Sequence, residues 1–209
     1  NGVAGSATIS VLNEDARAAI DKGAKINIGG NPAANNGESV VVRAIDQTNL
    51  FGLAGAIAAG GSTGVGAGID VAVITKDTIA IIDAGATVTA NRDVKVEAIS
   101  SEDISSMAAS IAIGGSNSLA AGLGVSVFSL TTRASIEGSP GGTVVNTGGS
   151  ILVAAQDQTF LDIIAGNFSA SGSAALGGAA AVPIIIETIE AYIGDGVTVN
   201  AKGTQPGIK

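Results

Sequence analysis

Acidic side chains are the strongest candidates for chemistry in this sequence. Asp21, Asp83 and Glu137 recur at equivalent places, each at the end of an alternating apolar segment, and Asp195 lies one residue later in a fourth such place. Because carboxylate oxygens are the ligands that Ca²⁺ prefers, a column of them could bind calcium between repeated layers. The alternative is a turn residue that accepts hydrogen bonds from nearby backbone amides. We prefer the turn interpretation, since the glycine- and aspartate-rich calcium-binding repeat is absent.

Two pairs of acids, Glu102 with Asp103 and Glu187 with Glu190, have the composition of a glycosidase site. Such a site needs two carboxyl groups across a cleft, together with other groups that hold the sugar. The chain has no Trp, no His and a single Tyr, so little is present on which a sugar ring could stack. We therefore expect exposed strand or turn residues at these positions.

A glycine-rich stretch, "GSTGVGAG" at Gly61–Gly68, invites comparison with phosphate-binding loops. A P-loop requires Lys directly after its last glycine, and here Ala67 follows Gly66. The dinucleotide-binding fingerprint requires Gly-x-Gly-x-x-Gly before a helix, whereas the following residues alternate like a strand. Both nucleotide-binding interpretations therefore fail on spacing.

Composition excludes several further classes of function. Without His or Cys the chain can form no Ser-His-Asp or Cys-His nucleophile and no imidazole or thiolate zinc site. The net charge is −8, and no Lys or Arg occurs between Arg133 and Lys202. Nucleic acid, which is bound largely by neutralising phosphates, is therefore not an expected partner. No cofactor is expected, and only oxygen-ligated ions such as calcium remain conceivable.

Internal repeats organise the whole chain. The segment Asp15–Ile26 matches Asp77–Val88, and further matches follow at similar intervals along the sequence. A second block recurs as Ser39–Ala44, Asp93–Ala98 and Ser150–Ala155. Residues 1–209 therefore form one repeat array, with approximate copies 1–46, 47–100, 101–158 and 159–209. Because the first and last copies lack parts of the unit, we expect an excerpt of a longer protein or a subunit that its neighbour completes.

Alternation between large apolar and small or polar residues predicts strands in every copy. It is clear in Ile69–Ile74, Ala86–Ala90 and Val197–Ala201, and Gly, Asn and Asp clusters between such segments indicate turns. Asn13–Asp21 has some helical propensity, but its counterparts alternate like strands, so we predict a strand there too. The unit could form two long coils or three short ones.

Small residues define one face of the glycine-rich strands. Gly64 is replaced by Ser118 and Ala175 in the other copies, whereas Val65 is replaced only by leucines. Interchange among Gly, Ser and Ala indicates a demand for small volume. We therefore predict that another sheet, from the next repeat or subunit, packs closely against this face, while Val and Ile fill the other face.

Charge-free runs occur in three of the copies, at 47–69, 104–132 and 163–186. Each is long enough to cross a bilayer as a helix. The runs are rich in Gly and Ser and alternate at every second residue, which is not the pattern of a spanning helix. Membrane insertion is therefore not expected.

Units such as "TIAIIDAGATVTANRDVKVEA" (Thr78–Ala98) and "IEAYIGDGVTVNAKG" (Ile189–Gly203) resemble the repeats of large bacterial filamentous-haemagglutinin-like surface adhesins. The resemblance covers essentially the whole chain, although its short alternating motifs have low specificity. It implies a β-solenoid or parallel β-helix, a secreted or cell-surface location, and a role as stalk, adhesin or matrix component. That family supplies no catalytic residues.

Taken together, the sequence predicts an all-β repeat protein, a β-solenoid or parallel β-helix whose Gly/Ala-rich strands pack sheet on sheet. The expected function is structural and adhesive, without catalysis, as a rod or filament of stacked strands. Expected partners are neighbouring repeats or subunits, with surface polysaccharide or host protein as further candidates. Two alternatives stay open: a filament subunit that polymerises through strand edges, and a polysaccharide-acting enzyme on a β-helix.

Overall fold

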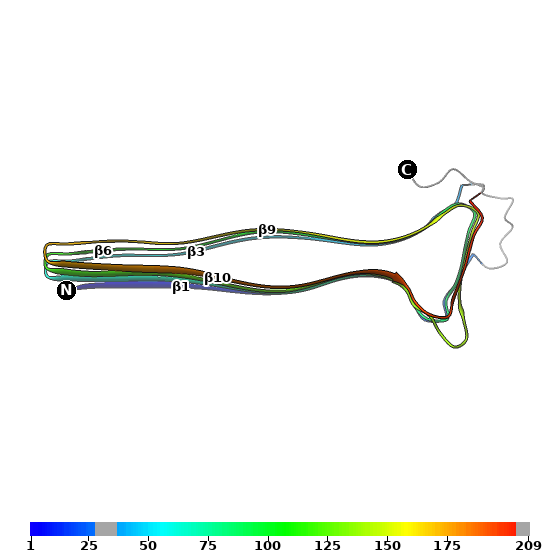
Figure 1. The fold of residues 1–209 in the computed structure, drawn as a ribbon, viewed down its shortest axis with the longest axis horizontal. Helices are drawn as coiled ribbons and strands as arrows, with labels where there is room; N and C mark the ends of the chain where they lie inside the picture. The colour runs from blue at the N-terminus through cyan, green and yellow to red at the C-terminus, as the bar shows by residue number, and fades with distance from the viewer. Residues whose placement is uncertain (28–36, 204–209) are drawn as a thin grey trace.

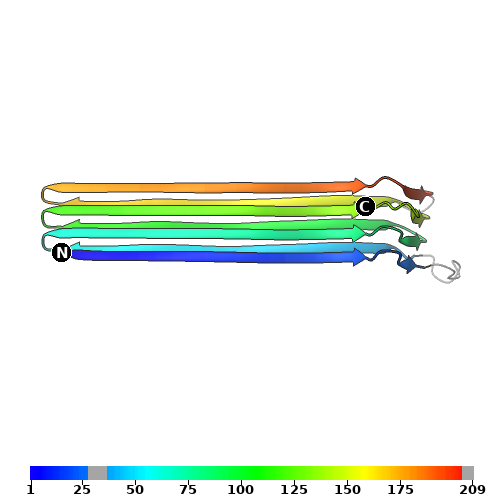
Figure 2. The ribbon, with the colours of Figure 1, turned by 90° about the horizontal axis from the view of Figure 1, so that it is seen from below.

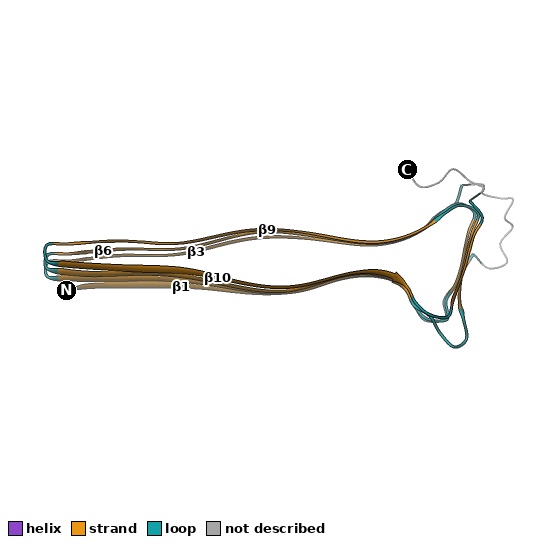
Figure 3. Cartoon of the chain, viewed as in Figure 1, coloured by secondary structure: helices purple, strands orange, loops and turns teal. Residues whose placement is uncertain are grey.

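A computed structural model describes residues 1–27 and 37–203, and strands dominate this part of the chain. The strands fall into a long and a short class (Figure 3). In chain order they are β1 (Gly2–Ile20), β2 (Lys25–Ile26), β3 (Val40–Gly60), β4 (Thr63–Ile82), β5 (Thr87–Ala90), β6 (Val94–Gly114), β7 (Asn117–Ile136), β8 (Thr143–Thr147), β9 (Ile151–Ser171), β10 (Ala174–Ile193) and β11 (Val197–Ala201). The predicted all-β class is confirmed, and Asn13–Asp21 lies almost entirely in strand β1.

Three parallel sheets run along the stack of repeats. The first long sheet has the order β1-β4-β7-β10, the second long sheet β3-β6-β9, and the short sheet β11-β8-β5-β2. Every pairing between neighbouring strands is parallel. The chain therefore winds as a parallel β-solenoid, and successive coils lie beside one another (Figure 2).

One repeat makes one coil. A coil consists of a strand in the second long sheet, a tight turn, a strand in the first long sheet and a short strand, as in β3, β4 and β5. The expectation of two long or three short coils per unit was wrong, because each charge-free run contains one tight turn and each half of the run extends the alternating segment beside it into a long strand. In cross-section the coil is a narrow blade that opens into a triangle at the short sheet (Figure 1).

The strand register sets residues of successive coils side by side. Asp15 pairs with Asp77, and Ile82 pairs with Ile136, so each residue lies beside its counterpart in the next copy. The approximate copy limits after residues 46, 100 and 158 fall inside β3, β6 and β9. A solenoid repeats without a natural starting point, so these limits describe the period rather than separate structural units.

Small side chains fill the blade, as predicted. Gly64, Gly66 and Gly68 point toward the second long sheet, and a Cβ atom at Gly64 would lie 2.3 Å from the carbonyl oxygen of Ile113 on β6. Their φ angles lie outside the left-handed region, so the constraint is space. The sheet that packs against the glycine stretch belongs in part to the next repeat.

The triangular end has a conventional apolar core. Val88, Val94, Val96, Ile82 and Ile136 are fully buried there, where the three sheets meet. A smaller cluster of Ile74, Ile104, Phe128 and Leu130 lies between the two long sheets. At the corner before the short sheet the chain changes direction at a glycine with positive φ, such as Gly85 at 75°. Only glycine adopts this conformation without strain.

Candidate functional site

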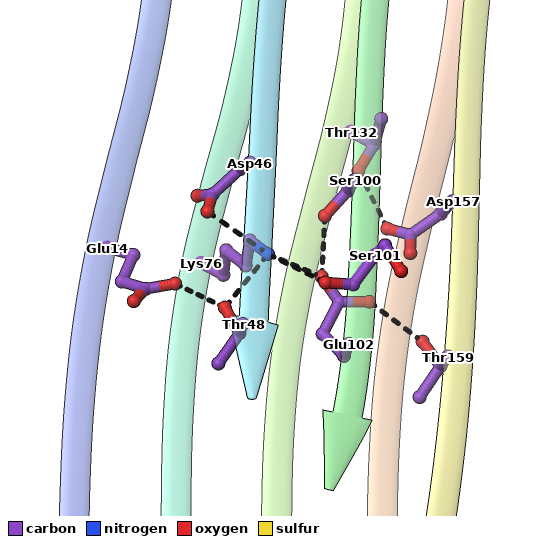
Figure 4. Close-up of polar contacts among 10 residues, drawn as sticks. All are labelled: Glu14, Asp46, Thr48, Lys76, Ser100, Ser101, Glu102, Thr132, Asp157 and Thr159. Atoms are coloured by element: carbon purple, nitrogen blue, oxygen red, sulfur yellow. Dashed lines mark hydrogen bonds and ion pairs between the residues drawn. The ribbon is translucent and has the colours of Figure 1, made fainter. Parts of the chain in front are cut away.

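A row of polar side chains crosses the interior between the apolar core and the narrow blade (Figure 4). On the first long sheet Glu14, Lys76 and Glu187 occupy one inward row with Leu130. On the second long sheet Asp46, Ser100 and Asp157 form one inward row. Thr48, Glu102 and Thr159 form the next. We call the polar members of these three rows the polar layer. They share the inward face of their strands because alternation places every second residue of a strand on the same face, and Glu187 on the last coil is exposed.

Lys76 is the centre of this polar layer. Its side chain is 1 % exposed, and its Nζ lies 2.8 Å from Glu102 Oε1 and 3.3 Å from Asp46 Oδ1. The same ammonium donates hydrogen bonds to Thr48 Oγ1 at 3.0 Å and to the carbonyl oxygen of Ser101 at 3.5 Å. These contacts join strands of two successive coils, and Thr48 extends them to a third by donating to Glu14 on β1.

Glu102 is charged although it is buried. Burial by itself raises its pKa, but the Lys76 ammonium and the hydroxyl of Ser100 outweigh that effect and hold the pKa below its usual value. Ser100 Oγ donates to Oε1 at 2.5 Å, and Thr159 Oγ1 donates to Oε2 at 3.1 Å. Both carboxylate oxygens therefore have partners.

Asp157 has the opposite environment. Burial and the neighbouring Glu102 carboxylate raise its pKa to about 6, and the charge of Glu187 adds to this. Thr132 Oγ1 donates to Oδ2 at 2.7 Å, whereas Oδ1 is buried without a hydrogen-bond partner. Leu130 occupies the place that Lys76 has one coil earlier. Asp157 therefore lacks the cation that stabilises Glu102.

The acidic pairs considered from the sequence are not brought together. Adjacent residues of a strand face opposite ways, so Glu102 points inward while its neighbour Asp103 points outward. The expectation of exposed residues was therefore wrong for Glu102, which is 1 % exposed. Glu187 and Glu190 are separated by an odd number of positions on β10, so they too lie on opposite faces. Neither pair forms two carboxyl groups across a cleft.

The recurring acids lie at the corner where each strand of the first long sheet ends. The backbone amide of Asp83 donates a hydrogen bond to the carbonyl oxygen of Ile20, and the amide of Glu137 donates to the carbonyl oxygen of Ile82. Asp83 Oδ1 accepts a hydrogen bond from the amide of Ala84 at 2.7 Å, as a turn residue does. Glu137 accepts from Ser135 and Tyr192, and the place of Asp195 in this column is taken by Gly194. Asp21 directly follows β1 at the same corner. Within residues 1–27 and 37–203 no group of three or more acidic side chains could hold a metal ion.

A shallow groove crosses the outer surface of the short sheet. It is lined by Thr89, Asn146 and Asn200, which form one outward row across β5, β8 and β11. Asn200 Nδ2 donates to Asn146 Oδ1 at 2.8 Å, so the two side-chain amides join neighbouring coils. Asn27 continues the row by donating to the carbonyl oxygen of Thr89 at 3.0 Å. We call this surface the amide groove.

Three comparisons with known proteins were made. No family model matches it, and no curated protein and no solved structure gives a match. Among the described residues there is also no helix that is long and apolar enough to cross a membrane.

Sequence reasoning missed Lys76, Asp46 and Asp157 as members of an interior layer. The available signal was the alternation along the strand. Lys76 lies two positions after the inward-facing Ile74, and therefore on the same face, and Leu130 stands in its place in the next copy. Because Lys76 and Glu102 are buried between the sheets, this part of the layer can stabilise the stack, but a substrate in solution does not reach it. The amide groove is a polar surface that a ligand can reach.

Proposed function

We propose that this chain is a structural segment of an extracellular adhesive protein, in which stacked coils form a rod without catalysing a reaction. The register carries the proposal, since each coil adds one strand to each of the three sheets. Strands of a sheet lie about 4.8 Å apart, so each further unit lengthens the stack by that amount. The sequence resemblance to adhesin repeats supports the same role.

Adhesion is assigned to the amide groove. Asn and Thr side chains present both donors and acceptors, which suits the hydroxyl groups of a polysaccharide. Because Thr89, Asn146 and Asn200 recur once per coil, the groove offers a linear row of similar contacts to a linear chain of sugars. A surface polysaccharide is therefore the partner that this groove fits best, and a host protein is the alternative that the test must distinguish.

A glycan array tests this assignment. The wild-type chain is expected to bind one or more linear polysaccharides and to leave their length unchanged. The double substitution Asn146→Ala with Asn200→Ala should remove most of that binding. Gln156→Ala, at an outward polar residue on the second long sheet, serves as the matched control and should bind like the wild type. Equal binding by all three proteins, binding to host proteins only, or shortening of the glycan would overturn the proposal.

End-to-end polymerisation through strand edges is less well supported. If β1 of one copy continued the first long sheet after β10 of another, the observed register would place Glu14 beside Glu187. The second long sheet has three described strands against four in the others, so such a junction would also leave one strand position empty. Repulsion and lost backbone hydrogen bonds both oppose that junction.

A further inference from the structure

The outer face of the first long sheet is apolar over the half of each strand nearest the tight turns. Outward residues alternate along Val3–Val11, Val65–Val73, Leu119–Val127 and Leu176–Ile184, in five rows across the four strands. All of them are Gly, Ala, Val, Leu or Ile. We call this surface the apolar face. In the corresponding part of the second long sheet four of the five outward rows are apolar as well, and the fifth contains Ser105 and Asp162.

The apolar face carries larger side chains than the interior behind it. On the inner strands Leu119 is 46 % exposed, Ile69 39 % and Leu123 36 %, while the inward residues of the same strands are mostly Gly, Ala and Ser. Burial of apolar surface is the main favourable term in folding, and here the chain leaves many of its larger apolar groups uncovered. This distribution indicates that another surface covers them.

The size of the apolar face matches one side of a stable protein interface. Four strands at about 4.8 Å and five rows at about 6.7 Å give roughly 600 Å². The largest apolar patch on an ordinary monomer is about 300–600 Å², and each partner in a standard interface contributes about 800 Å². A few flanking residues would supply the difference.

We propose that the apolar face binds the same face of a second copy of this chain, with the strands of the two copies antiparallel. Charges support this orientation. Along the sheet, outward charged residues such as Asp15, Asp77 and Arg133 begin only beyond the five rows, toward the triangular end. An antiparallel pair therefore keeps the two charged ends apart while the uncharged halves overlap.

Two of the five rows are complementary in that orientation. The row that contains Ala67 is small in all four strands, and the row that contains Val71 is large in all four. When the overlap is centred on the row of Ile69, which lies between them, the Ala67 row of each copy faces the Val71 row of the other, while the large rows of Val65 and Val73 face each other at the two ends of the overlap. Interdigitated rows of this kind are how stacked sheets exclude water.

A lipid bilayer is the competing occupant, and binding to vesicles, measured below, distinguishes it from a second copy. The pairing does not depend on the adhesive role proposed above.

Sedimentation velocity over a concentration series tests the pairing. The wild-type chain of 20.0 kDa is expected to sediment as a dimer, and Val71→Lys with Val125→Lys should raise the dimer dissociation constant at least about 100-fold. The matched control, Ile57→Lys with Ile111→Lys, puts the same charges on the outer face of the second long sheet and should leave the dimer intact. Circular dichroism checks that both variants keep the β-fold.

A second measurement does not depend on disrupting the face. Because the chain has no cysteine, Leu123→Cys introduces a single thiol in the row on which the proposed overlap is centred. A bis-maleimide of about 10 Å, the usual spacing of packed sheets, should join two copies. Ile57→Cys should not be joined. Three outcomes would each overturn the proposal. These are a wild-type chain that is monomeric at all concentrations, a dimer that is lost in Ile57→Lys with Ile111→Lys but not in Val71→Lys with Val125→Lys, and binding to phosphatidylcholine vesicles in place of dimerisation.

Discussion

Lys76 lies among buried carboxylates, and at the scale of single residues its charge has the largest predicted effect. It contacts Asp46 and Glu102, and both would lose their cation in Lys76→Met. Removing one partner of a buried ion pair costs about 3–5 kcal/mol, because the remaining charge stays buried. Urea unfolding should show a loss of that size.

Two further variants separate this effect from a general loss of positive charge. Lys22→Met removes an exposed lysine at a turn and should change the free energy of unfolding by less than about 0.5 kcal/mol. Lys76→Met combined with Glu102→Gln should recover part of the loss, since the amide carries no charge. If Lys76→Met, Lys22→Met and the double variant all unfold at the same urea concentration, the interior ion pair contributes nothing.

Asp157 gives the fold a pH dependence of definite sign. Its pKa is about 6 in the folded chain against the ordinary value of 3.8, so the folded state binds an additional proton between these values. Deprotonation therefore costs stability as the pH rises from about 4 through about 6. Glu102, whose pKa is lowered, works the other way and loses its contribution as the pH falls below about 4.5.

The substitution Asp157→Asn isolates the first effect. At pH 8 the variant should be more stable than the wild type by about 1–2 kcal/mol, allowing for partial exposure, and near pH 4 the difference should vanish. Asp162→Asn, at an exposed position on the same strand, is the matched control. Thermal unfolding at several pH values measures this, and a constant difference from pH 4 to pH 8 would refute the assignment.

At the scale of elements, small side chains set the distance between the two long sheets in the blade. Gly64→Ala would place a methyl group 2.3 Å from a backbone carbonyl oxygen that cannot move without disturbing β6. We expect a loss of about 3 kcal/mol in the free energy of unfolding, at the upper end of what overpacking costs.

Gly178 is the matched control on the same sheet. It faces outward, and a Cβ there would meet no atom within 4 Å. Replacing a strand glycine by alanine reduces the entropy lost on folding, so Gly178→Ala should stabilise the chain by about 0.5–1 kcal/mol. Denaturant unfolding of both variants decides the matter, and equal effects would mean that the sheets can separate freely.

At the scale of the whole molecule, the fold is a stack in which each coil contacts its neighbours. In such arrays stability is close to a sum over units and interfaces. Duplicating residues 94–150, one coil from the start of β6 to the residue before β9, keeps a natural junction because Val94 and Ile151 are register partners.

The duplicated chain should be thicker by about 4.8 Å along the stack and should have a higher melting temperature. Small-angle X-ray scattering and calorimetry measure the two quantities. A protein that aggregates, or whose melting temperature falls, would show that the coils are not interchangeable modules.

Several levels of this structure could be predicted from the sequence because repeats and alternation report directly on strands. The match of Asp15–Ile26 with Asp77–Val88 reappears in the strand register. The interchange of Gly64 with Ser118 and Ala175 predicted close packing of another sheet, which the structure confirms. Local pattern carries this information, since each side chain of a strand has only two faces to choose from.

The length of the coil, the polar layer and the apolar face depended on the tertiary structure. Alternation continues unchanged along a strand, so it does not reveal where a strand ends. It also does not reveal which of two uncharged faces lies inside, and in the blade the smaller side chains proved to be the interior ones. Lys76, Glu102 and Asp157 meet only because parallel stacking brings residues tens of positions apart to the same depth. The period and the strands thus follow from local sequence pattern, whereas the winding of the chain settles which charges are buried together and which apolar residues remain outside.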